Sequence, residues 1–554
     1  MGTDIRRVGS VRRRGAGCVD VRPAGRSPAA LRPSLPLRRT ALALACCTAV
    51  AAAQAETWRI TPSVGILETY TSNVNDAPSG QEVGDWVTSL TAAVGVAGEG
   101  RRVKLNGSIA VTADLYAREN QNNTIYPTVN LFGSVEAIER FLFIDATANV
   151  SQTYQNAFGP QPGNNVNATA NRYTDQTYSL SPYIKGVLGA TDIVYEVRDD
   201  NYWTIASQYG DFDNNLPNTY ANNFLAYLAS QKGRAGWRVE YNRYAYVPDI
   251  VSGERTDSNG KYTIQLARGI LSYQYDPALQ VSLRAGYEDD QFLLTSSSGA
   301  IYGAGFQWNP NERTQVGGFW EERFFGPSYQ LTASHRRPNS AFSANASRGL
   351  TTTPVSFSIP AGANVAQFVD SAFTTRIPDP AQRAQAVEQF LTKTGLPPTL
   401  ASPVSYYGAS ILLTDAANVS FALLGVRNAL TFSLFYLKQR PISGTGDVLP
   451  PALQGGPNDN TQTGGGVGFS HQLTGLTSFV ANASYNRTTS NASEGALSDT
   501  ASNNVNASVG FATRFGPKTT GTAGVSYYSY RPTDVLDGRG YDTFNVYAGV
   551  NHQF

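Results

Sequence analysis

From Trp58 to the last residue, apolar and polar side chains alternate along the chain with a period of two. Odd positions of 103–115 are apolar or glycine and even positions mostly polar, and 142–150 and 505–511 show the same alternation. Successive side chains of a strand point to opposite faces, so the pattern predicts strands with one apolar and one polar face. Several runs extend over 11 to 15 residues, which exceeds the ~5–6 of typical soluble strands and suits tilted strands that cross a membrane.

The connections between these strands alternate between short and long. Short links such as 98–100, 138–140 and 187–189 are separated by long ones rich in Asn, Ser, Gly and Pro, such as 157–171 and 440–459; the link at Phe325-Gly326 is an exception. Outer-membrane barrels combine short periplasmic turns with longer outer loops, an alternation that a soluble sandwich has no reason to keep. The sequence therefore predicts an all-β fold: a transmembrane antiparallel β-barrel of the outer-membrane type, with about 22 strands (range about 18–24) and one helical insertion.

The last predicted strand ends at the final residue and has an apolar alternate face. Apart from His552, the residues of that face resemble the signal by which the barrel assembly machinery recognises outer-membrane proteins; they are Phe544, Val546, Ala548, Val550 and Phe554. We therefore expect this machinery to be a partner of the chain.

The first 55 residues have the features of a secretory signal peptide. Ten arginines between Arg6 and Arg39 precede the 14-residue apolar stretch Thr40–Ala53, and Ala53 and Ala55 form an Ala-x-Ala cleavage site. The basic region is long for such a signal, and the apolar stretch is too short to span a membrane. The sequence predicts that residues 56–554 form a single outer-membrane β-barrel.

Composition excludes several other functions. All three cysteines lie in the first fifty residues, so the rest of the chain cannot hold a disulfide framework or a thiolate metal site. Without residues 1–55 the chain has 33 basic and 40 acidic residues, and no basic tract follows Arg39. Nucleic-acid binding requires a basic patch or stripe and is therefore disfavoured.

One segment, residues 353–407, departs from the strand pattern. It is rich in Pro and Ala, and Asp379-Pro380 predicts the start of a helix that Gly395 ends. Its apolar positions recur at helical spacing and are Ala384, Val387, Phe390 and Leu391. Two interpretations are open: a capped surface loop, which we favour, or a plug or gate inside the lumen.

Side chains that could carry out catalysis or bind metal are scattered. His335, His471 and His552 are far apart in sequence, each on its own predicted strand. The acidic pairs Asp199-Asp200, Asp289-Asp290 and Glu321-Glu322 point to opposite faces of their strands, so we interpret them as lumen or rim charges. We therefore expect no catalytic residues, cofactor or metal, and no enzyme.

Aromatic side chains gather near the strand ends, as at Trp58, Trp86, Trp203, Trp237 and Trp308. Most fit the aromatic girdles that contact outer-membrane lipids. Parity places some aromatic side chains inside the barrel, where they could stack on sugar rings.

Three segments resemble an outer-membrane family associated with PEP-CTERM/exosortase systems and exopolysaccharide gene clusters. The segment 58–74 resembles its opening, 308–314 and 323–335 its middle, and 377–397 its characteristic insertion. The resemblance covers nearly all of the chain after the signal and extends to putative β-barrel porins of polysaccharide loci.

The resemblance implies a passage or scaffold in the outer membrane of a Gram-negative bacterium, for export of exopolysaccharide or PEP-CTERM surface proteins. Polysaccharide and export components are then expected partners. A general diffusion porin is the main alternative. A barrel enzyme is a weaker one, because the sequence shows no convergent catalytic site.

Overall fold

The computed structural model describes residues 57–207, 218–249, 262–291, 296–351, 412–441, 459–491, 500–533 and 540–554, together with 365–374 and scattered residues between 377 and 396. These residues belong to one structural unit, Glu56–Phe554. Residues 1–56 lie outside the described part, so the signal peptide and its cleavage at Ala53 and Ala55 stay predictions.

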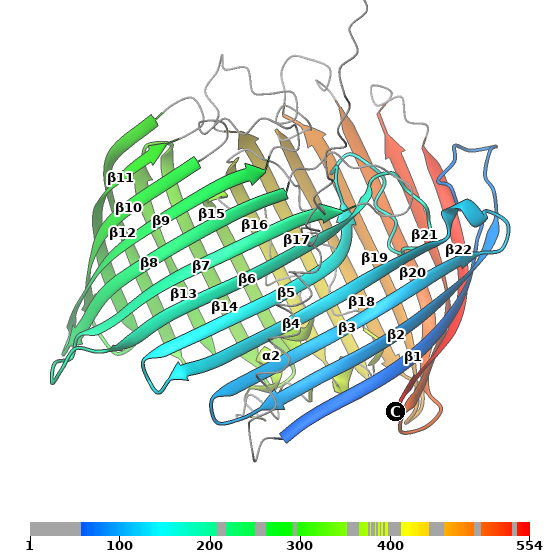
Figure 1. Cartoon of the computed structure of the whole chain (residues 1–554), viewed down its shortest axis with the longest axis horizontal. Coiled ribbons are helices and arrows are strands. Elements are labelled where there is room, and N and C mark those ends of the chain that lie inside the picture. Colours follow the sequence, from blue (N-terminus) through cyan, green and yellow to red (C-terminus); the bar gives the residue numbers. More distant parts are fainter. Residues whose placement is uncertain are drawn as a thin grey trace, which may run out of the picture. The chain divides into compact units, whose positions relative to one another are not determined.

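The predicted 22-stranded barrel is confirmed. All strand pairs are antiparallel, and β1 pairs with β22, so that the sheet closes on itself (Figure 1). The strands are β1 (Thr57–Thr71), β2 (Asp85–Glu99), β3 (Val103–Tyr116), β4 (Thr124–Ile138), β5 (Leu142–Tyr154), β6 (Arg172–Val187), β7 (Val194–Ser207), β8 (Asn218–Lys232), β9 (Ala235–Asp249), β10 (Tyr262–Gln274), β11 (Leu279–Gln291), β12 (Ser296–Asn311), β13 (Thr314–Arg323), β14 (Gly326–Arg337), β15 (Ser340–Thr351), β16 (Leu412–Leu424), β17 (Asn428–Pro441), β18 (Asn460–Gln472), β19 (Thr477–Ser490), β20 (Ala501–Arg514), β21 (Thr519–Pro532) and β22 (Tyr541–Gln553).

The two ends of the barrel differ as predicted. Even-numbered strands lead into short turns, such as 100–102 and 233–234, at the end where Phe554 also lies; we call it the turn end (Figure 1). The opposite loop end carries longer connections such as 72–84 and 155–171. The predicted exception is also at the loop end, where β13 and β14 are joined tightly through residues 324–325. Gly326 follows with φ of 90°, a conformation that favours glycine.

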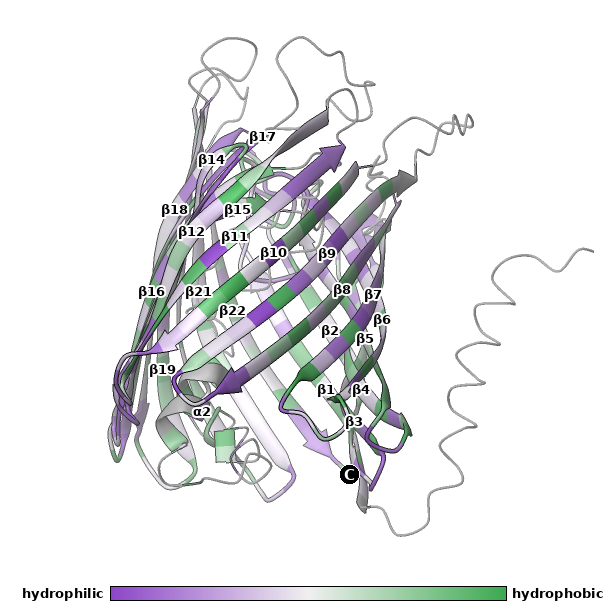
Figure 2. Ribbon diagram, turned by 90° about the vertical axis from the view of Figure 1, so that its left-hand side faces the viewer, coloured by the Kyte–Doolittle hydropathy of each residue, from purple (hydrophilic) through white to green (hydrophobic). Residues whose placement is uncertain are grey.

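Side chains alternate between the two faces of the wall. On β22, Phe544, Val546 and Val550 are exposed on the outer face, whereas Thr543 and Asn545 are buried on the inner face. The alternation of apolar and polar positions is visible along the strands in Figure 2. The outer face is thus an apolar surface suited to lipid, and the lumen is lined by polar groups.

The helical insertion contains more helix than predicted. Gly395 has φ of 68° and its N–H donates to the Leu391 carbonyl, which confirms the predicted helix end. The predicted start at Asp379-Pro380 lies outside the described residues. A second helix, α2 (Val365–Phe373), was not predicted. Among the helices of the described residues, none is long and apolar enough to cross a membrane.

Candidate functional site: the lumen and the segments inside it

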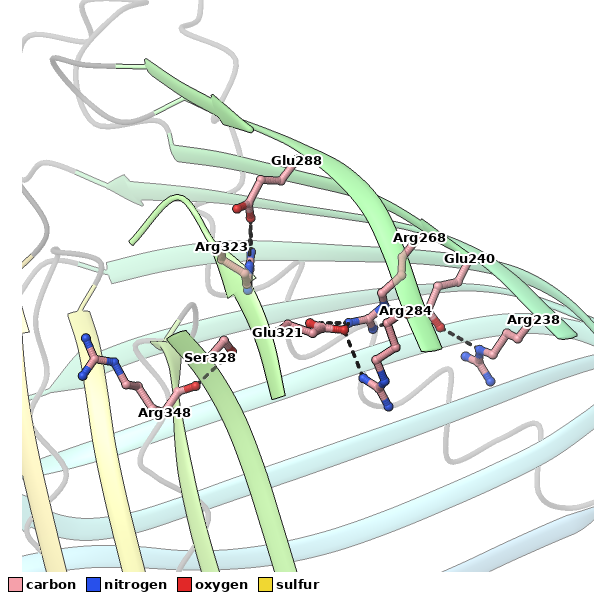
Figure 3. A network of polar contacts seen from close by, with 9 residues as sticks. All are labelled: Arg238, Glu240, Arg268, Arg284, Glu288, Glu321, Arg323, Ser328 and Arg348. Carbon is pink, nitrogen blue, oxygen red and sulfur yellow. Dashed lines mark hydrogen bonds and ion pairs between the residues drawn. The ribbon is translucent and has the colours of Figure 1, made fainter. Parts of the chain in front are cut away.

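A chain of alternating acids and arginines runs along the inner face of β9 to β13 (Figure 3). Arg268 lies between two acids: Nη1 is 2.6 Å from Glu321 Oε1, and Nη2 contacts Glu240. Glu240 also accepts from Arg238 Nε at 2.6 Å, and Glu321 from Arg284 Nη1 at 3.1 Å. Three arginines thus share two acids, and this group carries one net positive charge.

Two further arginines, each paired with acids, extend this surface on both sides. Toward the loop end, Arg323 Nε donates to Glu288 Oε2 at 2.8 Å, and the Phe324 N–H donates to the other oxygen of the same acid. Toward β5, Arg198 contacts Asp200 at 2.6 Å and Asp145 at 3.2 Å. We call the inner face of β7 to β13 the charged arc.

Several charges of this arc are deeply buried, and burial of an unpaired charge is costly. The Glu321 and Glu288 side chains keep only 3% and 0% of their surface exposed, so each depends on its arginine partners. Three arginines also lie over aromatic rings: Arg238 over Tyr227 at 3.8 Å, Arg284 over Phe319 at 4.1 Å and Arg198 over Tyr183 at 4.6 Å. Stacking fixes the planes of these guanidinium groups.

The inner face of β18 to β20 is different and we call it the neutral arc. It carries amide and hydroxyl side chains that are buried: Asn460, Gln462, Ser470, Ser478, Asn486, Thr488, Ser502 and Asn504. Three glycines on β18 add no side chains; they are Gly464, Gly466 and Gly468.

The loop 155–171 folds into the lumen and packs on the neutral arc and on β21. The Gln161 N–H donates to Asn504 Oδ1 at 3.1 Å and to the Tyr528 hydroxyl at 2.6 Å. The Gly163 N–H donates to Asn506 Oδ1 at 2.9 Å. In return, the Tyr530 hydroxyl donates to the Phe158 carbonyl at 2.8 Å. These bonds join β5 and β6 to strands on the far side of β22 and β1.

A second set of contacts ties this loop to the connection 72–84. Asn167 Nδ2 donates to the Asn73 carbonyl at 2.9 Å and to Asp76 Oδ1 at 3.3 Å, and Arg172 donates to carbonyls of the loop. Burial raises the pKa of the Asp76 carboxyl to about 7, although nearby Tyr541 and Arg172 oppose the shift. The acid therefore changes charge near neutral pH.

The insertion lies inside the barrel, against inner-face residues at the turn end. Val365 and Val369 of α2 are fully buried and pack in one cluster with Ala341, Ala422 and Ala429, from β15, β16 and β17. The predicted apolar stripe belongs to this cluster through Val387, Phe390 and Leu391, whereas Ala384 lies outside the described residues. The favoured prediction of a surface loop is therefore wrong for the described part, because its apolar side chains are covered by the inner wall.

The insertion is also fastened by specific polar contacts. Arg383 Nε donates to Asp370 Oδ1 at 2.8 Å and so joins the second helical segment to α2. Ser470 of the neutral arc donates to the Thr394 carbonyl at 2.6 Å. A Cβ atom on Gly395 would lie 2.8 Å from Ala512 Cβ, so only glycine fits between this segment and β20.

Both internal segments pack on the same part of the wall. Loop 155–171 contacts β19 to β21 from the loop end, and the insertion contacts β15 to β20 from the turn end. Among the described residues, neither segment packs on the charged arc in the contacts given above, so this arc is one part of the wall that faces the remaining lumen. A solute that enters the barrel would therefore meet paired arginines and acids.

The structure places the sequence-predicted residues as follows. Phe544, Val546, Val550 and Phe554 lie exposed on the outer face, as an assembly signal on the last strand requires, while its recognition stays a prediction. The acidic pairs split between faces: Asp200, Asp290 and Glu321 are buried inside, whereas their sequence neighbours point outward. His335, His471 and His552 contact Thr314, Asn428 and Thr519 separately, and no cluster of metal-ligating side chains occurs among the described residues.

Sequence reasoning missed the partners of these charges and the inward fold of loop 155–171. The arginines of the arc occupy the polar positions of their strands, as in Arg238, Arg268 and Arg284. Their parity could have placed them in the lumen. Their pairing across strands could not be found without the register.

Neither a family model nor a curated relative matches the chain. The chain is similar to OpdK of Pseudomonas aeruginosa crystallised with vanillate (8% identity, TM-score 0.34, 89% of this chain and 99% of that one). It is also similar to the FrpB iron transporter of Neisseria meningitidis (10%, 0.42, 89% and 81%) and to the siderophore receptor PirA of Acinetobacter baumannii (8%, 0.41, 90% and 81%).

The closed antiparallel sheet, its apolar outer face and its polar lumen define the class of the protein. It is a transmembrane β-barrel of the outer-membrane type.

Proposed function

We propose that the chain forms a constricted passage through the outer membrane of a Gram-negative bacterium, in a system that exports exopolysaccharide or PEP-CTERM surface proteins. The observation that carries the proposal is the lumen: a charged arc faces the space that two inward-folded segments leave open. A scaffold would not require charged groups to be held in place inside the barrel. The export role is supported by the resemblance of segments 58–74, 308–314, 323–335 and 377–397.

Removal of the insertion tests the passage. Replacing 356–404 with a short Gly-Ser linker should raise the single-channel conductance of the purified barrel in a planar bilayer, because the cluster around Val369 and Phe390 would no longer narrow the turn end. As a control, replacing the turn-end residues 516–518, which contribute nothing to that cluster, with Gly and Ser should leave the conductance unchanged. An insertion-deleted barrel that folds and conducts like the parent would contradict the proposed constriction.

A gene deletion tests the export role. Loss of the protein should reduce secreted polysaccharide or surface-anchored PEP-CTERM proteins, and the full chain should restore them. A general diffusion porin is the alternative, since a polar lumen also suits small solutes. It would be favoured if export were unchanged while uptake of neutral sugars into proteoliposomes rose. An enzyme is less well supported, because the carboxylates of Glu240, Glu288 and Glu321 are engaged by arginines.

A further inference from the structure

A cleft of about 660 Å³ opens on the inner wall beside the charged arc, in the half toward the turn end. Strands β7 to β14 line it. Its charged residues are Arg238, Arg284 and, at the rim, Asp192, which accepts from the Ser230 hydroxyl; Phe319 lies beside the arginines, and Gln280, Gln307 and Gln330 also line the cleft. The size is within the ~300–1,000 Å³ of small-molecule sites, which typically combine apolar walls with a few fixed polar groups.

The two arginines are only partly used by the protein. Arg238 donates to Glu240 through Nε, and its side chain keeps 36% of its surface exposed. Arg284 donates to Glu321 through Nη1, while its buried Nε has no partner. If the group served only as a brace for the wall, a third arginine would be unnecessary, because Arg268 already bridges both acids.

The guanidinium groups are also held in fixed planes. Arg238 lies on the Tyr227 ring and Arg284 on the Phe319 ring. A fixed, planar guanidinium with free N–H groups binds carboxylates well, since two parallel hydrogen bonds can form at little cost in side-chain entropy. The neighbouring glutamine amides can donate to and accept from hydroxyl groups.

We propose that this cleft binds an acidic sugar, with its carboxylate on Arg238 and Arg284 and its hydroxyl groups on the glutamines. The inference deepens the proposed passage: it names the chemical class of the solute that the charged arc selects. A neutral saccharide would leave the arginine donors unused, and a small carboxylate would leave the glutamines unused.

Calorimetry on the detergent-solubilised full chain tests the site without requiring conduction. Trigalacturonate should bind, whereas maltotriose, which has no carboxylate, and propionate, which has no hydroxyl group, should bind at least about tenfold more weakly at the same concentration. Arg284→Gln should weaken trigalacturonate binding by roughly tenfold or more, the scale of one charged hydrogen bond. Arg284→Lys keeps the positive charge beside Glu321 but loses the planar guanidinium that can donate two parallel hydrogen bonds. It should therefore weaken binding less than Arg284→Gln does.

Arg487→Gln is the matched control, because Arg487 is exposed and lies on β19 at a position whose parity faces outward. It should leave binding unchanged. Equal binding of maltotriose, equal binding of propionate, absence of trigalacturonate binding, or identical affinities of folded Arg284→Lys and parent would each overturn the inference. Conductance measured separately distinguishes the two proposals: a conducting barrel without sugar binding refutes only the site, whereas a binding barrel without conductance refutes only the passage.

Discussion

The charged arc and the neutral arc are built on the same sheet but satisfy their buried polar groups in different ways. On the charged arc, side chains find partners on other strands of the wall, as Arg268 does with Glu240 and Glu321. On the neutral arc, many partners come from inside the lumen, as the backbone of loop 155–171 does for Asn504. The ion pairs of the first surface lie within the wall itself, whereas the second surface binds internal segments.

This difference suggests separate roles for the two surfaces. A surface whose charges form ion pairs within the wall can remain open to solutes, because no internal segment is needed to pair them. A surface of amides and hydroxyls offers both donors and acceptors to a folded backbone, and so holds the segments that narrow the lumen.

The largest effect should come from breaking the charged arc. Glu321→Ala leaves Arg268 and Arg284 without their shared acid, and loss of one partner of a buried ion pair costs about 3–5 kcal/mol. Urea unfolding in lipid vesicles should show this loss. Asn482→Ala on the neutral arc, whose amide makes one long contact of 3.5 Å to Ser508, should cost much less. Equal losses would show that the two arcs do not differ.

A smaller effect should come from removing a hydrogen bond that holds loop 155–171 on the neutral arc. Asn504→Ala removes an acceptor of the Gln161 N–H, so its cost should be roughly 1–3 kcal/mol and loop 155–171 should become more mobile. Amide exchange of the loop is the measurement. Asn503→Ala is the control, because Asn503 accepts from the Tyr485 hydroxyl and makes no contact with the loop. If both variants exchange alike, Asn504 does not hold the loop.

The pH dependence of the same loop should follow Asp76. Its pKa is raised to about 7, so the folded loop prefers the protonated acid. When the loop is displaced, the carboxyl of this acid ionises near its ordinary pKa of about 4. The packed loop therefore loses stability as the pH rises from about 4 to about 7. The ratio of open to packed loop should increase by at most about tenfold per pH unit. Single-channel records should show more frequent loop opening at pH 7.5 than at pH 5.5.

Asp76→Asn removes this ionisation and should flatten the pH profile. Asparagine tolerates the positive φ of 54° at this position, so the backbone need not change. Arg172 and the tyrosines Tyr528 and Tyr541 are the other charged or titratable groups near the acid. These groups do not titrate between pH 5.5 and 7.5, so a variant that keeps the parent's profile would show that the pH response does not come from this acid.

The smallest effect should come from a pair of threonine hydroxyls on the inner faces of β2 and β3, which belong to neither arc. Thr112→Val breaks the 3.0 Å contact with Thr91 on β2, and cross-strand pairs of this kind contribute roughly 0.2–1 kcal/mol. Urea unfolding should show a shift within that range. A loss as large as that of Glu321→Ala would mean that polar lumen groups matter equally everywhere.

The barrel could be predicted from the sequence because each strand and each turn is marked by residues that lie close together in the chain. Alternation along 103–115 shows a strand within a dozen residues, and the short links show where the chain reverses. The helix end at Gly395 is local too, since glycine adopts a positive φ readily. The helix α2 was missed because it is short and lies in a Pro- and Ala-rich stretch, where the single start signal, Asn364 directly before it in the sequence, is weak evidence by itself.

The candidate site could be predicted only in part, because it depends on contacts between distant residues. Parity showed that Glu321 and Glu322 point to opposite faces, but it could not show that Arg268, 53 residues away, holds the inner acid. The position of the insertion could not be predicted for the same reason. An apolar stripe at Val387 and Phe390 requires a surface to cover it, and the sequence does not say whether that surface lies inside or outside the barrel.

The loop 155–171 also constrains the order of folding. Gln161 and Asn504 are 343 residues apart in the sequence, and the strands next to them lie on either side of the seam where β1 pairs with β22. Loop-closure entropy disfavours such distant contacts until intervening structure has formed. The loop should therefore pack into the lumen only after β1 has paired with β22. An open ring, as it exists during membrane insertion, would still have a wide lumen, and the barrel would narrow in its last step of maturation.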